Sequence, residues 1–184
     1  MADNRDVARH IALLRGINLG PNRRVAMADL RDLLTAAGYG DVQTYLQSGN
    51  VLLSSDSAAQ QLGAELEQRL RAGLALDVAV VVRSREELAD VVARNPLAGI
   101  AGDPKRYQVS FLSAALDPVR AAELAAVARA PERVIVSGRE IYAWHPSGVG
   151  QSALAKLLSD RRLGVPATAR NWNTITKLLE LADA

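Results

Sequence analysis

Polar and positively charged residues gather in four loops of this sequence, and their types suit the binding of an anion. Segments 15–24 and 47–50 lie in the first half of the chain, and segments 145–152 and 170–174 lie in the second half. Arginine forks and the backbone N–H groups of glycine-rich turns are groups with which proteins bind phosphate and carboxylate. The candidate ligand-binding residues in and beside these loops are Arg15, Asn18, Arg23, Arg24, Gln47, Ser48, Asn50, His145, Ser152, Lys156, Arg170, Asn171 and Asn173.

The groups needed for covalent or metal-assisted chemistry are sparse. The chain has no cysteine, and its two histidines are His10 and His145. We therefore expect neither a metal site nor a cofactor. His145 is the one candidate for a general acid or base. No serine–histidine–aspartate spacing and no carboxylate pair stands out, so the sequence assigns no catalytic residue.

The elements that must position these loops occur twice. Residues 7–83 and 106–169 each predict a strand, a helix, a hairpin of two strands, a second helix and a last strand, with a Ser-Gly pair in each hairpin. This βαββαβ order is that of the ferredoxin-like unit, an antiparallel sheet with helices on one face. The fold class is therefore α+β with two such subdomains, at 7–83 and 106–184, a linker helix and loop at 84–105, and a C-terminal helix.

Several loop residues are expected to cap the helices that follow them. A capping box is predicted where a serine is followed three residues later by a glutamate, and an aspartate before a proline is a second start signal. The predicted capping residues are Ser57, Ser84 with its partner Glu87, Asp117, and either Asn171 or Asn173.

The predicted topology brings the loops together in pairs. The third strand of a βαββαβ unit lies beside the first, so Asn50 should approach Arg15 and Gly16. In the second half, the glycine-rich loop 145–152 opens a helix and could form an anion nest at its N-terminus, with the end of the last strand nearby. The alternative is that these residues only shape turns.

Aromatic residues of the second half raise one other interpretation. Tyr107 and Phe111 share one strand face, as do Tyr142 and Trp144. Exposed aromatics on the central strands of such a sheet can stack RNA bases. Val109 shares the face of Tyr107 and Phe111, which favours packing in the core or between subdomains.

Four short motifs carry a resemblance to a known family. They are Ile11–Asn18, Tyr45–Val51, Arg94–Pro96 and Thr168–Thr174. In this order they resemble the bacterial family called domain of unknown function 1697, over nearly the whole chain. The resemblance implies a two-subdomain α+β fold and no activity, because the family has no established one. The chain departs from the family pattern at Pro21, where a second glycine is expected, and at Ala153, where a lysine usually follows the loop serine.

Composition indicates a cellular location, and the sequence leaves three functions open. The net charge is only +2, and no leading apolar run suggests a signal peptide or a membrane span. We expect a cytoplasmic protein with no membrane partner, and the sequence indicates no particular protein partner. The first hypothesis is a binding module for an anionic ligand, a nucleotide or nucleic acid. The alternatives are an enzyme acting on a small phosphate- or carboxylate-bearing substrate, and a structural or protein-interaction role.

Overall fold

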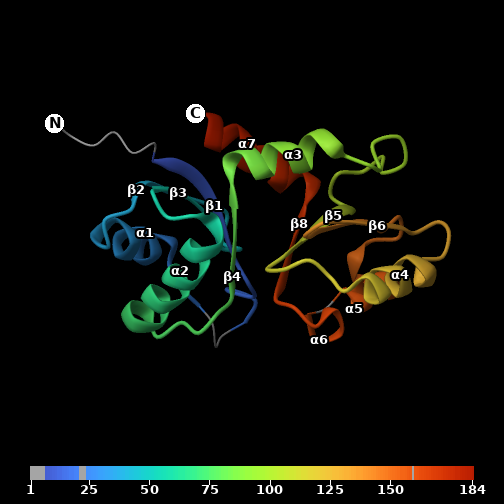
Figure 1. The fold of residues 1–184 in the computed structure, drawn as a ribbon, viewed down its shortest axis with the longest axis horizontal. Helices are drawn as coiled ribbons and strands as arrows, with labels where there is room; N and C mark the ends of the chain where they lie inside the picture. Colours follow the sequence, from blue (N-terminus) through green and yellow to red (C-terminus); the bar gives the residue numbers. More distant parts are fainter. Residues whose placement is uncertain (1–6, 21–23, 159) are drawn as a thin grey trace. The chain divides into compact units, whose positions relative to one another are not determined.

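The chain forms two compact units, shown in the computed structural model of Figure 1, which describes residues 7–20, 24–158 and 160–184. One unit comprises Met1–Ala89 and Leu178–Ala184, and the other comprises Asp90–Lys177. The division falls inside two helices, α3 (Arg85–Arg94) and α7 (Trp172–Asp183). The ranges predicted from the sequence differ from this division in assigning each of these helices whole to one region.

The first unit has the predicted βαββαβ order. Its elements are β1 (Ala8–Leu14), α1 (Met27–Ala36), β2 (Gly40–Tyr45), β3 (Asn50–Ser55), α2 (Ala59–Leu74) and β4 (Val80–Ser84). The strands lie in the order β2-β3-β1-β4 and all pairs are antiparallel. In the register of β1 with β3, Leu13 lies opposite Asn50, so the turn 46–49 and the loop after β1 meet at one end of the sheet, as expected.

The second unit repeats the order, with a 3-10 turn and two short helices in the place of the second helix. Its elements are β5 (Tyr107–Leu112), α4 (Pro118–Val127), β6 (Arg133–Ser137), β7 (Glu140–Trp144), the 3-10 turn η2 (Val149–Gln151), α5 (Ala153–Leu157), α6 (Asp160–Leu163) and β8 (Ala167–Asn171). The antiparallel strand order β6-β7-β5-β8 matches that of the first unit. The predicted fold class is confirmed.

Alternation along the strands decides which side chains form each core. In the first unit, Ala12 and Leu14 of β1 pack with Leu30 of α1 and Leu66 of α2, all of them buried. Residues two apart in a strand point to the same face, and leucines at helical spacing meet them from the covering helices. In the second unit, Leu112 packs in the same way with helical and loop leucines.

Three aromatic residues of the second unit, Tyr107, Phe111 and Tyr142, are buried on the other face of its sheet. Tyr107 and Tyr142 are at most 2% exposed. The Tyr142 hydroxyl donates a hydrogen bond to the Val91 carbonyl at 3.1 Å, and the Tyr107 hydroxyl donates to the Asn95 side chain at 3.0 Å. Trp172 stacks on Tyr107 with 4.7 Å between ring centroids. This face is therefore packed core, and its central rings are not available for stacking bases.

Three predicted helix caps are present. Ser84 and Glu87 form the reciprocal capping box, with N–H to side-chain oxygen distances of 3.2 and 2.9 Å. The Asp117 carboxylate accepts from two first-turn N–H groups of α4. Asn171 caps α7 by accepting from an N–H of its first turn at 2.9 Å. Local sequence signals were sufficient at these three positions.

The predicted cap at Ser57 is wrong. The residue before α2 is Ala58, and its side chain makes no capping hydrogen bond. The Ser57 hydroxyl instead donates to the carboxylate of Glu65, at 3.2 and 3.1 Å from its two oxygens. A partner two helical turns into α2 thus competes successfully with the helix end for this hydroxyl.

Candidate functional site

Asn18 connects the loop after β1 to the neighbouring hairpin through hydrogen bonds. Its side-chain amide donates to the carbonyl of Gln47 at 2.8 Å and to that of Val25 at 3.2 Å, and its oxygen accepts the Val25 N–H at 2.9 Å. Asn18 also has a positive φ of 55°, a conformation that asparagine tolerates better than most residues. The side chain therefore shapes the loop through backbone partners.

The hairpin turn is held from inside by Asn50. This residue is fully buried, and its amide donates to the Tyr45 carbonyl at 2.9 Å and to the Ser48 hydroxyl at 3.0 Å. Gly49 beside it has a φ of +81°, and a Cβ there would lie 2.7 Å from the Cβ of Leu14. The turn therefore requires glycine for two reasons, backbone conformation and space.

The remaining candidates of this first cluster differ in exposure. Gln47 and Ser48 are exposed at the turn, Arg15 is half-buried, and Arg24 is exposed. Arg23 lies outside the described residues. Binding of an anion by this cluster stays a prediction, with Arg24 as its most exposed guanidinium.

In the second cluster, Ser152 is the centre of a buried hydrogen-bond network. Its hydroxyl donates to the carboxylate of Glu132 and accepts the Ala155 N–H at 2.9 Å. The Nδ1 atom of His145 lies 2.8 Å from the same oxygen. Because the hydroxyl proton goes to an acceptor-only carboxylate, we assign Nδ1 as the protonated nitrogen of the ring. Ser152 thus caps α5 and joins three segments of the second unit.

This network does not resemble an activated nucleophile. Both acceptor positions of the Ser152 hydroxyl are occupied, so no lone pair is free to attack a substrate. His145 is fully buried, and its Nε2 atom has no partner among the described residues. Burial is the main cause that lowers the pKa of His145, with Glu132 opposing it. The ring is therefore neutral near pH 7 and contributes to structure.

The last strand ends beside the same loop, as the topology predicted. The His145 N–H donates to the Arg106 carbonyl and the Trp172 N–H donates to the Pro104 carbonyl, at 3.0 and 3.1 Å. The segment 104–106 is thus bonded both to the loop after β7 and to the residue after β8. The loop after β7 and the end of β8 therefore lie at the same end of the sheet.

Arg170, in contrast, is buried within β8. Its Nη1 donates to the Thr168 hydroxyl at 2.7 Å and to the Ala169 carbonyl at 2.8 Å. Burial lowers the pKa of Arg170 to about 10. Lys156 and Asn173 are exposed. None of these three side chains has been tested as a ligand contact, and each stays a candidate.

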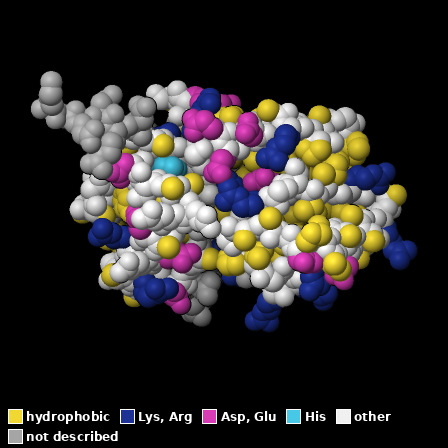
Figure 2. Space-filling model, in the orientation of Figure 1, with side chains coloured by type: hydrophobic (Ala, Val, Ile, Leu, Met, Phe, Trp, Pro, Cys, Tyr) yellow, Lys and Arg dark blue, Asp and Glu magenta, His cyan; other side chains and the backbone are white. Residues whose placement is uncertain are grey.

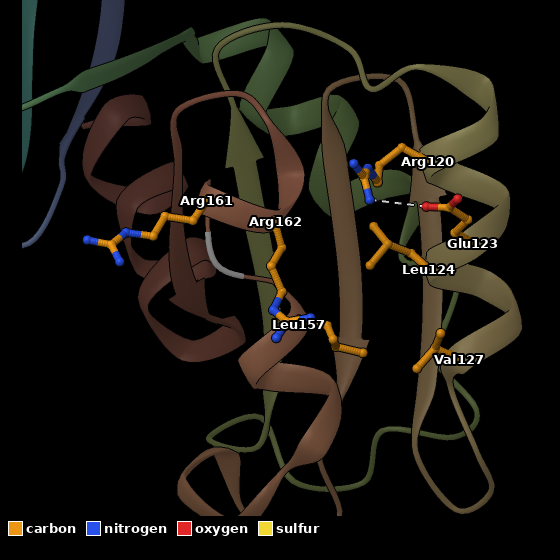
Figure 3. A pocket seen from close by; sticks show the side chains of 7 residues that line it. All are labelled: Arg120, Glu123, Leu124, Val127, Leu157, Arg161 and Arg162. Carbon is orange, nitrogen blue, oxygen red and sulfur yellow. Dashed lines mark hydrogen bonds and ion pairs between the residues drawn. The ribbon is translucent and has the colours of Figure 1, made fainter.

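A hollow on the helical face of the second unit brings cations together that the sequence analysis did not single out (Figure 3). We call it the arginine pocket; it has a volume of about 480 Å³. Its lining residues come from α4, α5 and α6 and are Arg120, Glu123, Leu124, Val127, Leu157, Arg161 and Arg162.

The arginine pocket combines positive charge with an apolar wall. Three arginines and one glutamate line it, and Arg120 is paired with the carboxylate of Glu123 at 3.1 Å. In Figure 3 the Arg162 side chain runs toward Leu157, whereas Arg161 points away from the other lining residues. Among the described residues, the Arg162 side chain forms no hydrogen bond or ion pair. Arg162 is therefore the cation best placed to meet an anion there.

No local sequence signal could have found this pocket. Arg120 lies in α4 and the adjacent Arg161 and Arg162 lie in α6, about 40 positions later, with no motif in common. They meet because α4, α5 and α6 cover the same sheet face, which packs Leu112 against Leu124 and Leu163. Only the arrangement of these helices on the sheet brings the cations together.

These features describe a class of α+β proteins built from two ferredoxin-like units. Residues 7–142 match the model of the family described as protein of unknown function (DUF1697), and the chain belongs to this family. The resemblance stated from the sequence motifs is confirmed. No curated protein matches the sequence.

A solved structure shares the fold over almost the whole chain. It is described as the conserved bacterial protein SP0830 from Streptococcus pneumoniae, and it has 24% sequence identity and a TM-score of 0.76. The similarity covers 97% of this chain and 99% of that chain. It establishes the two-unit architecture. Within the described part of the chain, no helix is both long and apolar enough to cross a membrane.

Proposed function

We propose that this protein is a binding module for a small organic anion, and that the arginine pocket receives it. The observation that carries the proposal is the pairing of Arg162 with an apolar wall in a hollow of about 480 Å³. Ligand pockets of this size commonly have apolar walls and a few polar groups that fix orientation. Guanidinium groups recognise phosphate and carboxylate through paired hydrogen bonds.

The apolar side of the pocket supports an organic anion over a bare inorganic ion. Leu124 is buried, and Leu157 and Val127, which are partly or largely exposed, complete the apolar wall. A ring or short chain of the ligand would cover these side chains while its phosphate or carboxylate meets Arg162. A mononucleotide combines both parts, with a flat base and a charged phosphate.

The distribution of charge favours a small ligand over a nucleic acid. A nucleic-acid surface usually shows a basic stripe that follows the phosphate backbone. On the face drawn in Figure 2, the Lys and Arg side chains occur in separate small groups among apolar and acidic ones. The net charge of +2 agrees with this distribution.

Binding is a better supported proposal than catalysis. An enzyme would need an accessible acid, base or nucleophile beside the ligand. The one hydroxyl–imidazole contact among the described residues, Ser152 with His145, is buried and has its acceptor positions occupied. We place this binding function in the cytoplasm, in keeping with a chain that has no cysteine.

The test is thermal unfolding of the full chain with AMP, ATP, a sugar phosphate and inorganic phosphate, each alone. A ligand present at about 100 times its Kd stabilises the folded state by about 2.7 kcal/mol, which raises Tm by several degrees. Arg162→Ala should remove the shift produced by the organic anions. Arg24→Ala is the matched control, because it removes an exposed guanidinium from the loop cluster of the first unit.

The two variants separate the two candidate anion sites. Loss of the shift in Arg162→Ala, with the shift intact in Arg24→Ala, supports the arginine pocket. The opposite pattern would overturn this proposal and support the loop cluster of the first unit. A shift that survives in both variants, or no shift with any ligand, would also reject the arginine pocket.

A further inference from the structure

A second hollow, in the first unit, has a different chemistry. It has a volume of about 590 Å³ and lies between the turn after α1, the turn after β3 and one face of α2. We call it the mixed-charge pocket, and its polar wall includes Tyr39, Ser55, Asp56, Ser57, Glu65 and Arg69. We propose that this pocket binds a small zwitterion, namely an α-amino acid or a dipeptide, through Glu65 and Arg69.

Glu65 is fixed as an acceptor for the positive end of such a ligand. Ser57 donates to both oxygens of its carboxylate, at 3.2 and 3.1 Å, and the Tyr39 hydroxyl lies 3.5 Å away. A carboxylate has about four acceptor positions, so capacity remains for an ammonium group. The carboxylate of Asp56 adds negative charge to the same wall.

Arg69 supplies the complementary charge at a suitable spacing. It is exposed and follows Glu65 by four residues in α2, so both side chains project from the same face of the helix. Side chains four apart in a helix have Cβ atoms about 5–6 Å apart. The two charged side chains can therefore reach one small molecule that carries its ammonium and carboxylate groups on a single carbon atom or one peptide unit apart.

Tyr39 stays protonated between these two charges. Burial is the main cause that raises the pKa of Tyr39, Glu65 adds to the rise, and Arg69 opposes it. The phenol therefore acts as a neutral donor in the wall. Its position gives the pocket a polar group whose charge does not change near pH 7.

His10 lies next to a wall residue of this pocket. It lies on the same face of the sheet as Ser55, since His10 pairs with Leu53 in the register of β1 with β3. The ring is 3% exposed, and burial is the main cause that lowers the pKa of His10, opposed by a hydrogen bond with the Ser55 backbone. A ligand that contacts Ser55 would therefore change the surroundings of the His10 ring.

The two histidines allow a direct test by NMR of the full chain. His10 contacts Ser55, which lines the mixed-charge pocket, and His145 lies in the other unit and serves as the internal reference. The probes are L-alanine and L-alanyl-L-alanine, with propionate and ethylamine as ligands that carry one charge only. We expect at least one zwitterion to shift the ring signals of His10 saturably, with the signals of His145 unchanged.

A matched pair of variants on α2 completes the experiment. Arg69→Gln removes the guanidinium from the pocket and should weaken binding at least tenfold. Arg71→Gln is the control, because Arg71 is exposed on the same helix and is paired with Asp77 at 2.7 Å. No saturable shift with either zwitterion, an equal shift with propionate or ethylamine, or unchanged affinity in Arg69→Gln would overturn the inference. Arg162→Ala should not alter the result, so the test is independent of the arginine pocket.

Discussion

The two units begin their helices in different ways although they share one topology. In the first unit, α1 and α2 follow Ala26 and Ala58, whose side chains cannot accept a hydrogen bond. In the second unit, α4 and α5 follow Asp117 and Ser152, whose oxygens accept from first-turn N–H groups. A side-chain cap usually contributes about 1 kcal/mol to stability. The second unit therefore depends more on individual polar residues, and the first depends more on its packed helical face.

The hairpin glycines show the reverse contrast: here the first unit is the one that depends on a particular residue. Gly49 and Gly138 occupy equivalent turns and both have positive φ, at 81° and 60°. A Cβ at Gly49 would meet Leu14 and Ile17 at less than 3 Å, whereas a Cβ at Gly138 would meet nothing within 4 Å. Repetition of a Ser-Gly pair in the sequence thus fixes the backbone turn and leaves the surroundings free to differ.

The largest effect is expected for Gly49→Ala. A positive φ costs an alanine about 1–2 kcal/mol, and overpacking against Leu14 adds about 1–3 kcal/mol. Unfolding in urea should therefore show a loss of about 3 kcal/mol. Gly138→Ala keeps only the backbone cost and should lose about 1–2 kcal/mol. Equal losses in the two variants would contradict the contrast between the hairpins.

Ser152→Ala should rank second, with a loss of about 2–3 kcal/mol. The change removes the cap of α5 and leaves Glu132 and the Nδ1 atom of His145 without their shared partner. Urea unfolding measures the loss, and the ring signals of His145 should shift at the same time. A loss well below 1 kcal/mol would show that the network contributes little.

The converse substitution in the first unit is Ala58→Ser. Ala58 has the extended backbone conformation of an N-cap residue, so a serine can accept a first-turn N–H of α2. The variant should gain about 0.5–1 kcal/mol, because a cap is added without loss of any contact. A gain here together with a loss in Ser152→Ala would establish that the units differ in their use of caps.

Acid should destabilise the protein gradually through both histidines. Burial lowers the pKa of His10 and of His145 in the folded state below the value of about 6.5 for an unfolded chain. Between the two pKa values the unfolded chain binds more protons, so stability falls as the pH drops below about 6.5. Each ring contributes at most about 1.4 kcal/mol per pH unit. Urea unfolding at pH 7.5, 6.5 and 5.5 measures the slope, and a stability that rises toward pH 5.5 would contradict it.

Local patterns were sufficient to predict most of the fold. The βαββαβ order was predicted for both halves and is observed in both units, and the capping box at Ser84 needed only residues three apart. Strand bounds are harder to predict: the apolar residues Leu76 and Val78 join the core from an irregular segment, and the last strand of the first unit begins only at Val80. Burial alone does not distinguish such a segment from a strand, since both read as apolar in the sequence.

The candidate sites were less accessible from the sequence. Asn18 and Asn50 have the composition of a binding loop, and their amides bond to the backbone of the same loops. Arg162 and Glu65 belong to no motif, because their partners arrive from other elements. Ser57 was assigned to the helix end next to it, and a carboxylate eight residues away receives its proton instead. Contacts with residues that are distant in the sequence leave no local pattern from which they could be predicted.

The division of the chain has a consequence for the order in which the units are synthesised. Asp90–Lys177 is one continuous stretch, whereas the other unit includes Leu178–Ala184, and its Asp183 pairs with Arg85 at 2.6 Å. Domains tend to fold as units while the chain grows from the ribosome. The second unit, although it follows in the chain, has all its residues before the first has its last seven. During translation the first unit therefore lacks Leu178–Ala184, and with them the ion pair of Arg85 with Asp183, until the second unit has been synthesised.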